Sequence, residues 1–106
     1  MKKNLSIILT ELRRRFEVLY GARLVYLILF GSQARGDAEL GSDIDVLVVL
    51  NGLVNPGEEI ERTGGITAEL SLQHDVVISC VFVSIERYNY EYSPLLLNIH
   101  REGITV

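Results

Sequence analysis

The sequence is poor in the residues that mark several classes of small protein. Of its 106 residues only one is cysteine and two are proline, and there is no tryptophan. A single thiol, Cys80, excludes an internal disulfide and a zinc site built from paired cysteines. No positively charged residue stands beside Cys80 in the sequence to lower the pKa of its thiol. We therefore interpret Cys80 as a buried structural residue rather than a nucleophile.

The chain also lacks a dense basic surface and a long apolar run. Its net charge is −4 and its pI is near 5.1, which argues against duplex nucleic acid as the main partner. The one basic cluster, Arg13–Arg15, is interpreted as the solvated face of the first helix. No run approaches the ~20 apolar residues that span a bilayer. The N-terminus begins like a signal peptide but has no small-residue cleavage site, so we expect a cytoplasmic protein.

What the chain does contain is typical of one small folded domain. Apolar residues make up 48% of the sequence and charged residues 23%. This length fits a single α/β domain covering residues 1–106, with no room for a second. Because so short a chain buries little surface, a partner or a second copy could add to its stability.

Hydrophobic periodicity predicts the order helix, strand, strand, helix, strand, helix. Apolar residues at helical spacing indicate a first helix, and continuous β-branched and apolar runs indicate the strands. The predicted helices are 5–19, 55–73 and 94–101, and the predicted strands are 23–30, 44–50 and 76–83. The second strand, the middle helix and the third strand form a β-α-β unit, which makes these two strands parallel.

The first predicted strand ends in a turn with the features of a phosphate site. Gly31 would let a phosphate approach the backbone, and the N–H groups of the following turn would point at the anion. The hydroxyl of Ser32 can donate to a phosphate oxygen, and Arg35 can add a charged contact. Ser42 is a further candidate nucleotide-binding residue. A Gly-Ser turn by itself is a weak signal.

Two aspartates at the start of the second strand strengthen that signal. Asp43 and Asp45 flank Ile44, so both carboxylates project to one face of the strand. Two carboxylates about 5 Å apart repel by about 3 kcal/mol at an effective dielectric of 20. A divalent cation turns the repulsion into attraction, and hard oxygen ligands suit magnesium. A phosphate-binding turn that faces such a pair predicts phosphoryl or nucleotidyl transfer.

A plainer interpretation of the same residues is a capped turn followed by a solvated strand. In that case Ser42-Asp43 would only start the strand and Asp45 would face water. Asp45, however, opens an apolar run, where a bare carboxylate needs a partner. We therefore favour the functional interpretation.

The segment GSQARGDAELGSDIDVLVVL closely resembles the signature of the minimal nucleotidyltransferases of the DNA polymerase β superfamily. SPLLLNIHREG near the end resembles the closing helix of that family, so the resemblance covers nearly the whole chain. It implies a small mixed β-sheet flanked by helices, with magnesium and a nucleoside triphosphate donor such as ATP. By this resemblance Gly31 and Ser32 would hold the triphosphate, and Asp43 and Asp45 would bind metal.

The superfamily usually supplies a third carboxylate from a neighbouring strand, as a base or a metal ligand. The candidate is Asp75, which would stand at the start of the third strand and would add a catalytic and metal-binding group. Asp75 could instead be only the turn residue after the helix. In that case Ser79 on the same strand cannot replace it as a base, and the enzyme would be slow or inactive.

Proteins that resemble this one often pair with a small all-helical HEPN protein as toxin and antitoxin. The resemblance therefore implies transfer of AMP from ATP to a tyrosine of a HEPN-domain partner. Two alternatives remain open at this point. One is transfer to a small molecule such as an aminoglycoside, which the lack of a second domain argues against. The other is a non-catalytic module that neutralises its partner by binding.

The remaining polar and aromatic residues give weaker signals. His74 and His100 are isolated, so each is interpreted as a surface or cap residue. The alternating tyrosines of 88–92 predict an extended segment with one aromatic face, either an edge packed on the core or a partner surface. The apolar run 95–99 exceeds one face of a short helix, so part of it could contact a second chain, including a second copy.

Overall fold

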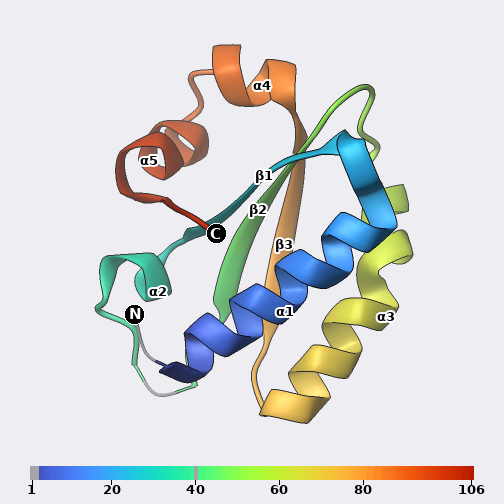
Figure 1. Cartoon of the computed structure of the whole chain (residues 1–106). Helices are drawn as coiled ribbons and strands as arrows, with labels where there is room; N and C mark the ends of the chain where they lie inside the picture. The colour runs from blue at the N-terminus through green and yellow to red at the C-terminus, as the bar shows by residue number, and fades with distance from the viewer. Residues whose placement is uncertain (1–2, 40) are drawn as a thin grey trace.

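The protein is a four-stranded mixed sheet with helices on both faces (Figure 1). The computed structural model describes residues 3–39 and 41–106. The strands are β1 (Leu24–Phe30), β2 (Ile44–Leu50), β3 (Ile78–Ser84) and β4 (Ile104–Thr105). The helices are α1 (Lys3–Tyr20), the short 3₁₀ turn η1 (Gly21–Arg23), α2 (Ser32–Arg35), α3 (Pro56–His74), α4 (Ile85–Tyr90) and α5 (Pro94–Glu102). None of these helices, within the described ranges, is both long and apolar enough to cross a bilayer.

The sheet has the strand order β3-β2-β1-β4. β2 and β3 are parallel and joined through α3, as the β-α-β pattern predicted. β1 runs antiparallel to β2, and the two-residue strand β4 adds to the other edge of β1. The small mixed sheet implied by the family resemblance is thus confirmed. Strand β4 was not predicted, because two residues are too few to show any periodicity.

The larger part of the core lies between the sheet and the helices α1 and α3, which lie side by side over one face (Figure 1). The apolar positions of α1 predicted from helical spacing are buried there, including Leu9, Leu12 and Phe16. Alternate residues of β2 point into this cluster, among them Ile44 and Val46. The partly buried side chain of Cys80 packs against the same cluster, and burial raises the pKa of its thiol to about 12. Cys80 is therefore a structural residue, as the sequence indicated.

A smaller apolar cluster lies on the opposite face, beneath α4 and α5. The other set of alternating β2 residues, Leu47 and Val49, points to this side. Leu96 and Ile99 of α5 pack against them, while Leu95 and Leu97 remain exposed. The short helices therefore cover only part of this face, and the start of β2 extends beyond them (Figure 1).

Two of the predicted elements differ from those observed. The third strand begins at Ile78 rather than at residue 76, because Asp75 still belongs to the end of α3. The predicted extended segment 88–92 is wrong in its first half, since residues 85–90 form α4. The Ser84 side chain accepts a hydrogen bond from the Arg87 N–H and caps this helix, a local signal that outweighs the alternating tyrosines.

His100 and the basic cluster Arg13–Arg15 contact other residues of the protein. His100 stacks on the ring of Tyr88, and its Nε2 lies 2.6 Å from the Tyr88 carbonyl oxygen. On the outer side of α1, Arg14 pairs with Glu11, and Arg15 pairs with Glu69 of α3. These ion pairs agree with the interpretation of Arg13–Arg15 as a solvated helix face.

Candidate functional site

Asp43 and Asp45 lie at the start of β2, on the face of the sheet that α4 and α5 only partly cover. Ile44, between them, points into the core beneath α1 and α3. Strand alternation therefore places both carboxylates on the side of Leu47. Asp43 is exposed and Asp45 is half-buried. The negative charge of Asp43 acts on the Asp45 carboxyl, so the two groups lie near each other.

Asp45 stands between two neighbouring strands that offer it no charged partner. Its register partners are Phe30 on β1 and Ser79 on β3. Among the described side chains, no arginine, lysine or histidine forms an ion pair with Asp43 or Asp45. Partial burial, and then the negative charge of Asp43, raises the pKa of the Asp45 carboxyl. The pair therefore carries charge that the described side chains do not neutralise.

Gly31 is fitted directly against this carboxylate. Its φ is 73° and its ψ is −157°, a conformation available almost only to glycine. A Cβ built on Gly31 would lie 2.6 Å from Oδ2 of Asp45. The sequence analysis explained Gly31 by the space that a phosphate needs to approach the backbone. The structure adds a second reason, because any side chain at position 31 would displace the Asp45 carboxylate.

The turn after Gly31 forms the one-turn helix α2 next to the aspartates. The N–H groups of Ala34 and Arg35 both donate to the Gly31 carbonyl oxygen. The side-chain amide of Gln33 donates to the Ser42 carbonyl oxygen at 3.3 Å, which ties α2 to the residue before Asp43. The N–H groups at the start of such a turn have no acceptor within it. Gly31, Ser32 and Ser42 are therefore brought to the same end of the sheet as the two aspartates.

Arg35 lies at the end of α2 and is already paired. Its Nε lies 3.2 Å from Asp37, and its Nη1 lies 3.7 Å from Glu102 of α5. The hydrogen bond to Asp37 raises the pKa of the guanidinium further above its ordinary value. The side chain is 45% exposed, so it is accessible from solvent, but a phosphate would have to compete with two carboxylates for it.

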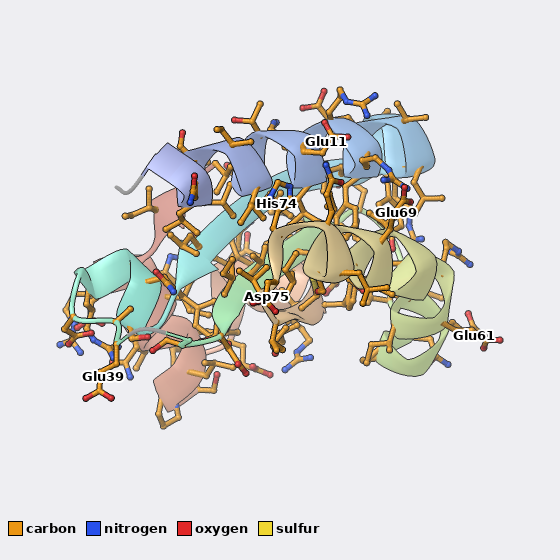
Figure 2. All side chains as sticks on the ribbon, turned by 90° about the horizontal axis from the view of Figure 1, so that it is seen from below. Glu11, Glu39, Glu61, Glu69, His74 and Asp75 are labelled. Atoms are coloured by element: carbon orange, nitrogen blue, oxygen red, sulfur yellow. The ribbon has the colours of Figure 1, made fainter. Side chains whose placement is uncertain are left out.

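The structure does not bring Asp75 to the aspartate pair. Asp75 caps the C-terminus of α3 with a left-handed backbone, φ 52° and ψ 52° (Figure 2). It lines a cavity of about 330 Å³ whose walls include the core residues Leu5 and Ile8 and also Ser42 of the candidate site. Asp43 and Asp45 point to the opposite face of the sheet from Leu5 and Ile8. The alternative interpretation, a turn residue after the helix, describes its position.

The chemistry of the pair suits a hard divalent cation such as magnesium. Two carboxylates on one strand face supply oxygen ligands, and Gly31 leaves the space that one of them occupies. Across residues 3–39 and 41–106, no group of three or more Asp, Glu, His or Cys side chains is arranged to hold a metal ion. Any cation at this site would therefore take only two charged ligands from the chain and the rest from water or substrate.

Sequence reasoning named Ser79 only as a residue that cannot act as a base, and did not place it beside Asp45. Ser79 lies directly beside Asp45 in the parallel register of β2 and β3. The signal was present in the β-α-β pattern, but using it requires the register, and register depends on how α3 packs. Without it, the nearest acidic residue in the sequence, Asp75, appeared the better candidate.

The chain was compared with known proteins by sequence. A family model described as "Nucleotidyltransferase domain" matches residues 5–98. The protein named "Putative protein adenylyltransferase MJ1305" from Methanocaldococcus jannaschii is 35% identical over 96 residues, covering 91% of this chain and 56% of that protein. A second protein of that organism, named "Putative protein adenylyltransferase MJ0604", is 40% identical over 70 residues. The match covers 66% of this chain and 64% of that protein. The chain thus spans little more than half of the first of these relatives.

Solved structures share the fold at low sequence identity. A crystal structure of a toxin-antitoxin with AMP-PNP matches 98% of this chain and 72% of the other, with a TM-score of 0.62 and 17% identity. A nucleotidyltransferase structure from Sulfolobus solfataricus matches 99% and 86% of the two chains, with a TM-score of 0.60 and 16% identity. At these identities the likeness establishes the fold.

Proposed function

The chain belongs to the nucleotidyltransferase domain family, and from that membership and the geometry around Asp45 we propose that it transfers AMP from ATP to a hydroxyl group of a protein. The observation that carries the proposal is the uncompensated pair of Asp43 and Asp45 beside the Gly31-Ser32 turn. An enzyme that binds a polyanion through a cation needs carboxylates that are free of internal partners. The pair fits this requirement.

In the proposed reaction the acceptor oxygen forms a bond to the α-phosphorus of ATP. The bond from this phosphorus to the oxygen bridging to the β-phosphorus breaks, pyrophosphate leaves with the electron pair, and the acceptor's proton passes to solvent. Asp43 and Asp45 would hold magnesium, which when bound neutralises charge on the phosphates. The N–H groups and hydroxyl of the Gly31-Ser32 turn would orient the triphosphate, and Ser42 and Arg35 would add further contacts to it.

We propose a protein as the acceptor, and specifically a tyrosine of a HEPN-domain toxin. The relatives in Methanocaldococcus jannaschii carry the name protein adenylyltransferase, and several structures with this fold are of a toxin-antitoxin, one of them with AMP-PNP. Apolar residues that a partner could cover are exposed on the chain, among them Leu95 and Leu97 of α5. These observations support a macromolecular acceptor that brings its own binding surface.

A specific observation also favours a second function, binding without catalysis. β3 presents Ser79, not an acid, beside Asp45, so the pair has no neighbouring general base. A chain with this site could bind a nucleotide and a partner and transfer AMP slowly or not at all. The experiment that follows separates the two functions.

The test mixes the purified chain with its HEPN-domain partner, ATP and magnesium, and measures AMP addition to the partner by mass spectrometry. We expect the partner to gain AMP, and Asp43→Asn with Asp45→Asn to lower the rate at least about 100-fold. Glu61→Gln is the matched control, because it removes an exposed carboxylate on α3 (Figure 2) and should leave the rate unchanged. Asp75→Asn should also leave the rate nearly unchanged, given its position on the other side of the sheet.

Two results would contradict the proposal. A partner that stays unmodified in the presence of the chain, ATP and magnesium would rule out transfer of AMP to that partner. If the Asp43/Asp45 double variant still neutralises the partner's toxicity in cells as the wild type does, binding alone is sufficient.

A further inference from the structure

The residue beside Asp45 on the neighbouring strand determines how many charges the site can offer a cation. The parallel register pairs Asp45 with Ser79 and Leu47 with Val81. Val81 packs in the cluster under α4 and α5, and Ile78 and Cys80 pack against the opposite core. Alternation therefore places Ser79 on the same face as Asp45. Ser79 is half-buried, so its hydroxyl has a place within the site.

Among the described residues, no other element supplies a third charged ligand. β1 places Phe30 on the other side of Asp45, and Val77 precedes Ser79 on the same face as Asp43. Asp75, the nearest acidic residue along the chain, lines the cavity beside Leu5 and Ile8. Within the described ranges no third acidic, histidine or cysteine ligand joins the pair.

A site with two carboxylates is suited to a cation that arrives with its substrate. Magnesium gives up its water reluctantly, and proteins often hold it with one or two carboxylates plus substrate phosphates. A third carboxylate on β3 would add both charge and a ligand, and would let the free protein hold the cation. Serine offers only a neutral oxygen.

We propose that Ser79 keeps the site at two carboxylates, so that magnesium binds together with the nucleoside triphosphate and is not held by the free protein. Position 79 is then the residue that sets metal affinity and the order of binding. This inference rests on the proposed function, since it assumes that Asp43 and Asp45 bind the metal of a triphosphate.

The wild-type chain provides the first test. Isothermal titration calorimetry measures the binding of magnesium alone, of AMP-PNP alone, and of magnesium to the protein in saturating AMP-PNP, with the binding of magnesium to free AMP-PNP subtracted. We expect weak or undetectable binding of magnesium alone and at least tenfold tighter binding with AMP-PNP present. Equal magnesium affinity with and without AMP-PNP would overturn the proposal. This comparison needs no substitution, so it decides even if a variant fails to fold.

The second test changes position 79 in the full chain. Ser79→Asp should tighten the binding of magnesium alone at least tenfold. Ser79→Asn should not, because asparagine has nearly the shape of aspartate but no charge. An affinity of Ser79→Asp within threefold of wild type, in a variant that melts cooperatively, would overturn the proposal. So would equal gains from the two substitutions.

A further variant separates this inference from the proposed function. If Asp43→Asn with Asp45→Asn abolishes the AMP-PNP-dependent binding of magnesium while Ser79→Asp has no effect, only the role of position 79 fails. If the double variant still binds magnesium with AMP-PNP as tightly as wild type, the proposed site itself is wrong.

Discussion

A carboxylate lies near each end of β2, and the surroundings of the two differ: Glu59 is buried, and Asp45 is half-buried. Near the end of β2, Glu59 in the first turns of α3 is 2% exposed. The Tyr20 hydroxyl donates to it at 2.7 Å, and Arg23 and Arg62 approach its two oxygens at 3.2 and 2.9 Å. Burial favours the neutral acid, but these hydrogen bonds and charges outweigh it and lower the pKa of Glu59.

At the start of the same strand, Asp45 has none of this support. Its nearest charged neighbour along the strand is Asp43, which has the same sign, and its pKa is raised. The difference teaches that burial alone does not reveal what a carboxylate does. Glu59 is paired on both oxygens within the chain, whereas Asp45 has no ion-pair partner among the described side chains, as the proposed metal-binding role requires.

Removing the negative charge of Glu59 should have the largest effect on stability. Glu59→Gln leaves two partly exposed arginines without their charged acceptor and should lower the free energy of unfolding by about 2–3 kcal/mol at neutral pH. Because the folded pKa of Glu59 is lowered, its stabilisation is present above the unfolded pKa and lost as pH falls through the folded value. Urea unfolding at several pH values should therefore show the gap between variant and wild type narrowing in acid.

The control for this substitution is Glu69→Gln, which removes an exposed carboxylate paired with Arg15. It should change the free energy of unfolding by less than about 1 kcal/mol. Similar losses for the two variants would show that the network around Glu59 contributes no more than a surface ion pair.

At the other end, Gly31→Ala should have the next largest effect. A side chain in this backbone conformation costs about 1–3 kcal/mol, and the new Cβ would also push against Asp45. We expect lower stability in urea unfolding together with lost AMP transfer. Gly52→Ala, at a positive φ in open space, is the matched control. It should lose stability and keep transfer, and loss of transfer in both variants would argue against a special role for position 31.

Asp45→Asn should sharpen the comparison by shifting stability in the opposite direction from Glu59→Gln. The raised pKa means that the ionised carboxylate is penalised in the folded state, fully so above its folded pKa. Neutralising it should therefore raise Tm slightly at neutral pH in the presence of a chelator, as measured by calorimetry. A lower Tm would mean that Asp45 is paired within the chain after all.

Arg35→Ala should have the smallest effect on stability. Its ion pairs with Asp37 and Glu102 are exposed, so the free energy of unfolding should change by less than about 1 kcal/mol. If Arg35 contacts the triphosphate, the KM for ATP should rise in steady-state transfer assays. An unchanged KM would remove Arg35 from the proposed site.

The sequence was sufficient for the larger elements and for the pair of aspartates. The periodicity of α1 and the apolar runs of β1 and β2 are local signals, and strand alternation alone places Asp43 and Asp45 on one face. The neighbour of Asp45 on β3 could not be predicted from the sequence, because the register between β2 and β3 depends on how α3 packs. The place of Asp75 could not be predicted either, since it depends on the left-handed backbone that holds Asp75 in the cap of α3.

The pairing of Phe30 with Asp45 has a consequence for how this protein is built during folding. The β1–β2 pair closes over residues 31–43, whereas β3 pairs with β2 only after residues 51–77, so the β1–β2 contacts have the lower sequence separation. Short-range contacts form faster than long-range ones. We therefore expect Gly31 and the two aspartates to come together early, and the strand that carries Ser79 to join an already assembled hairpin.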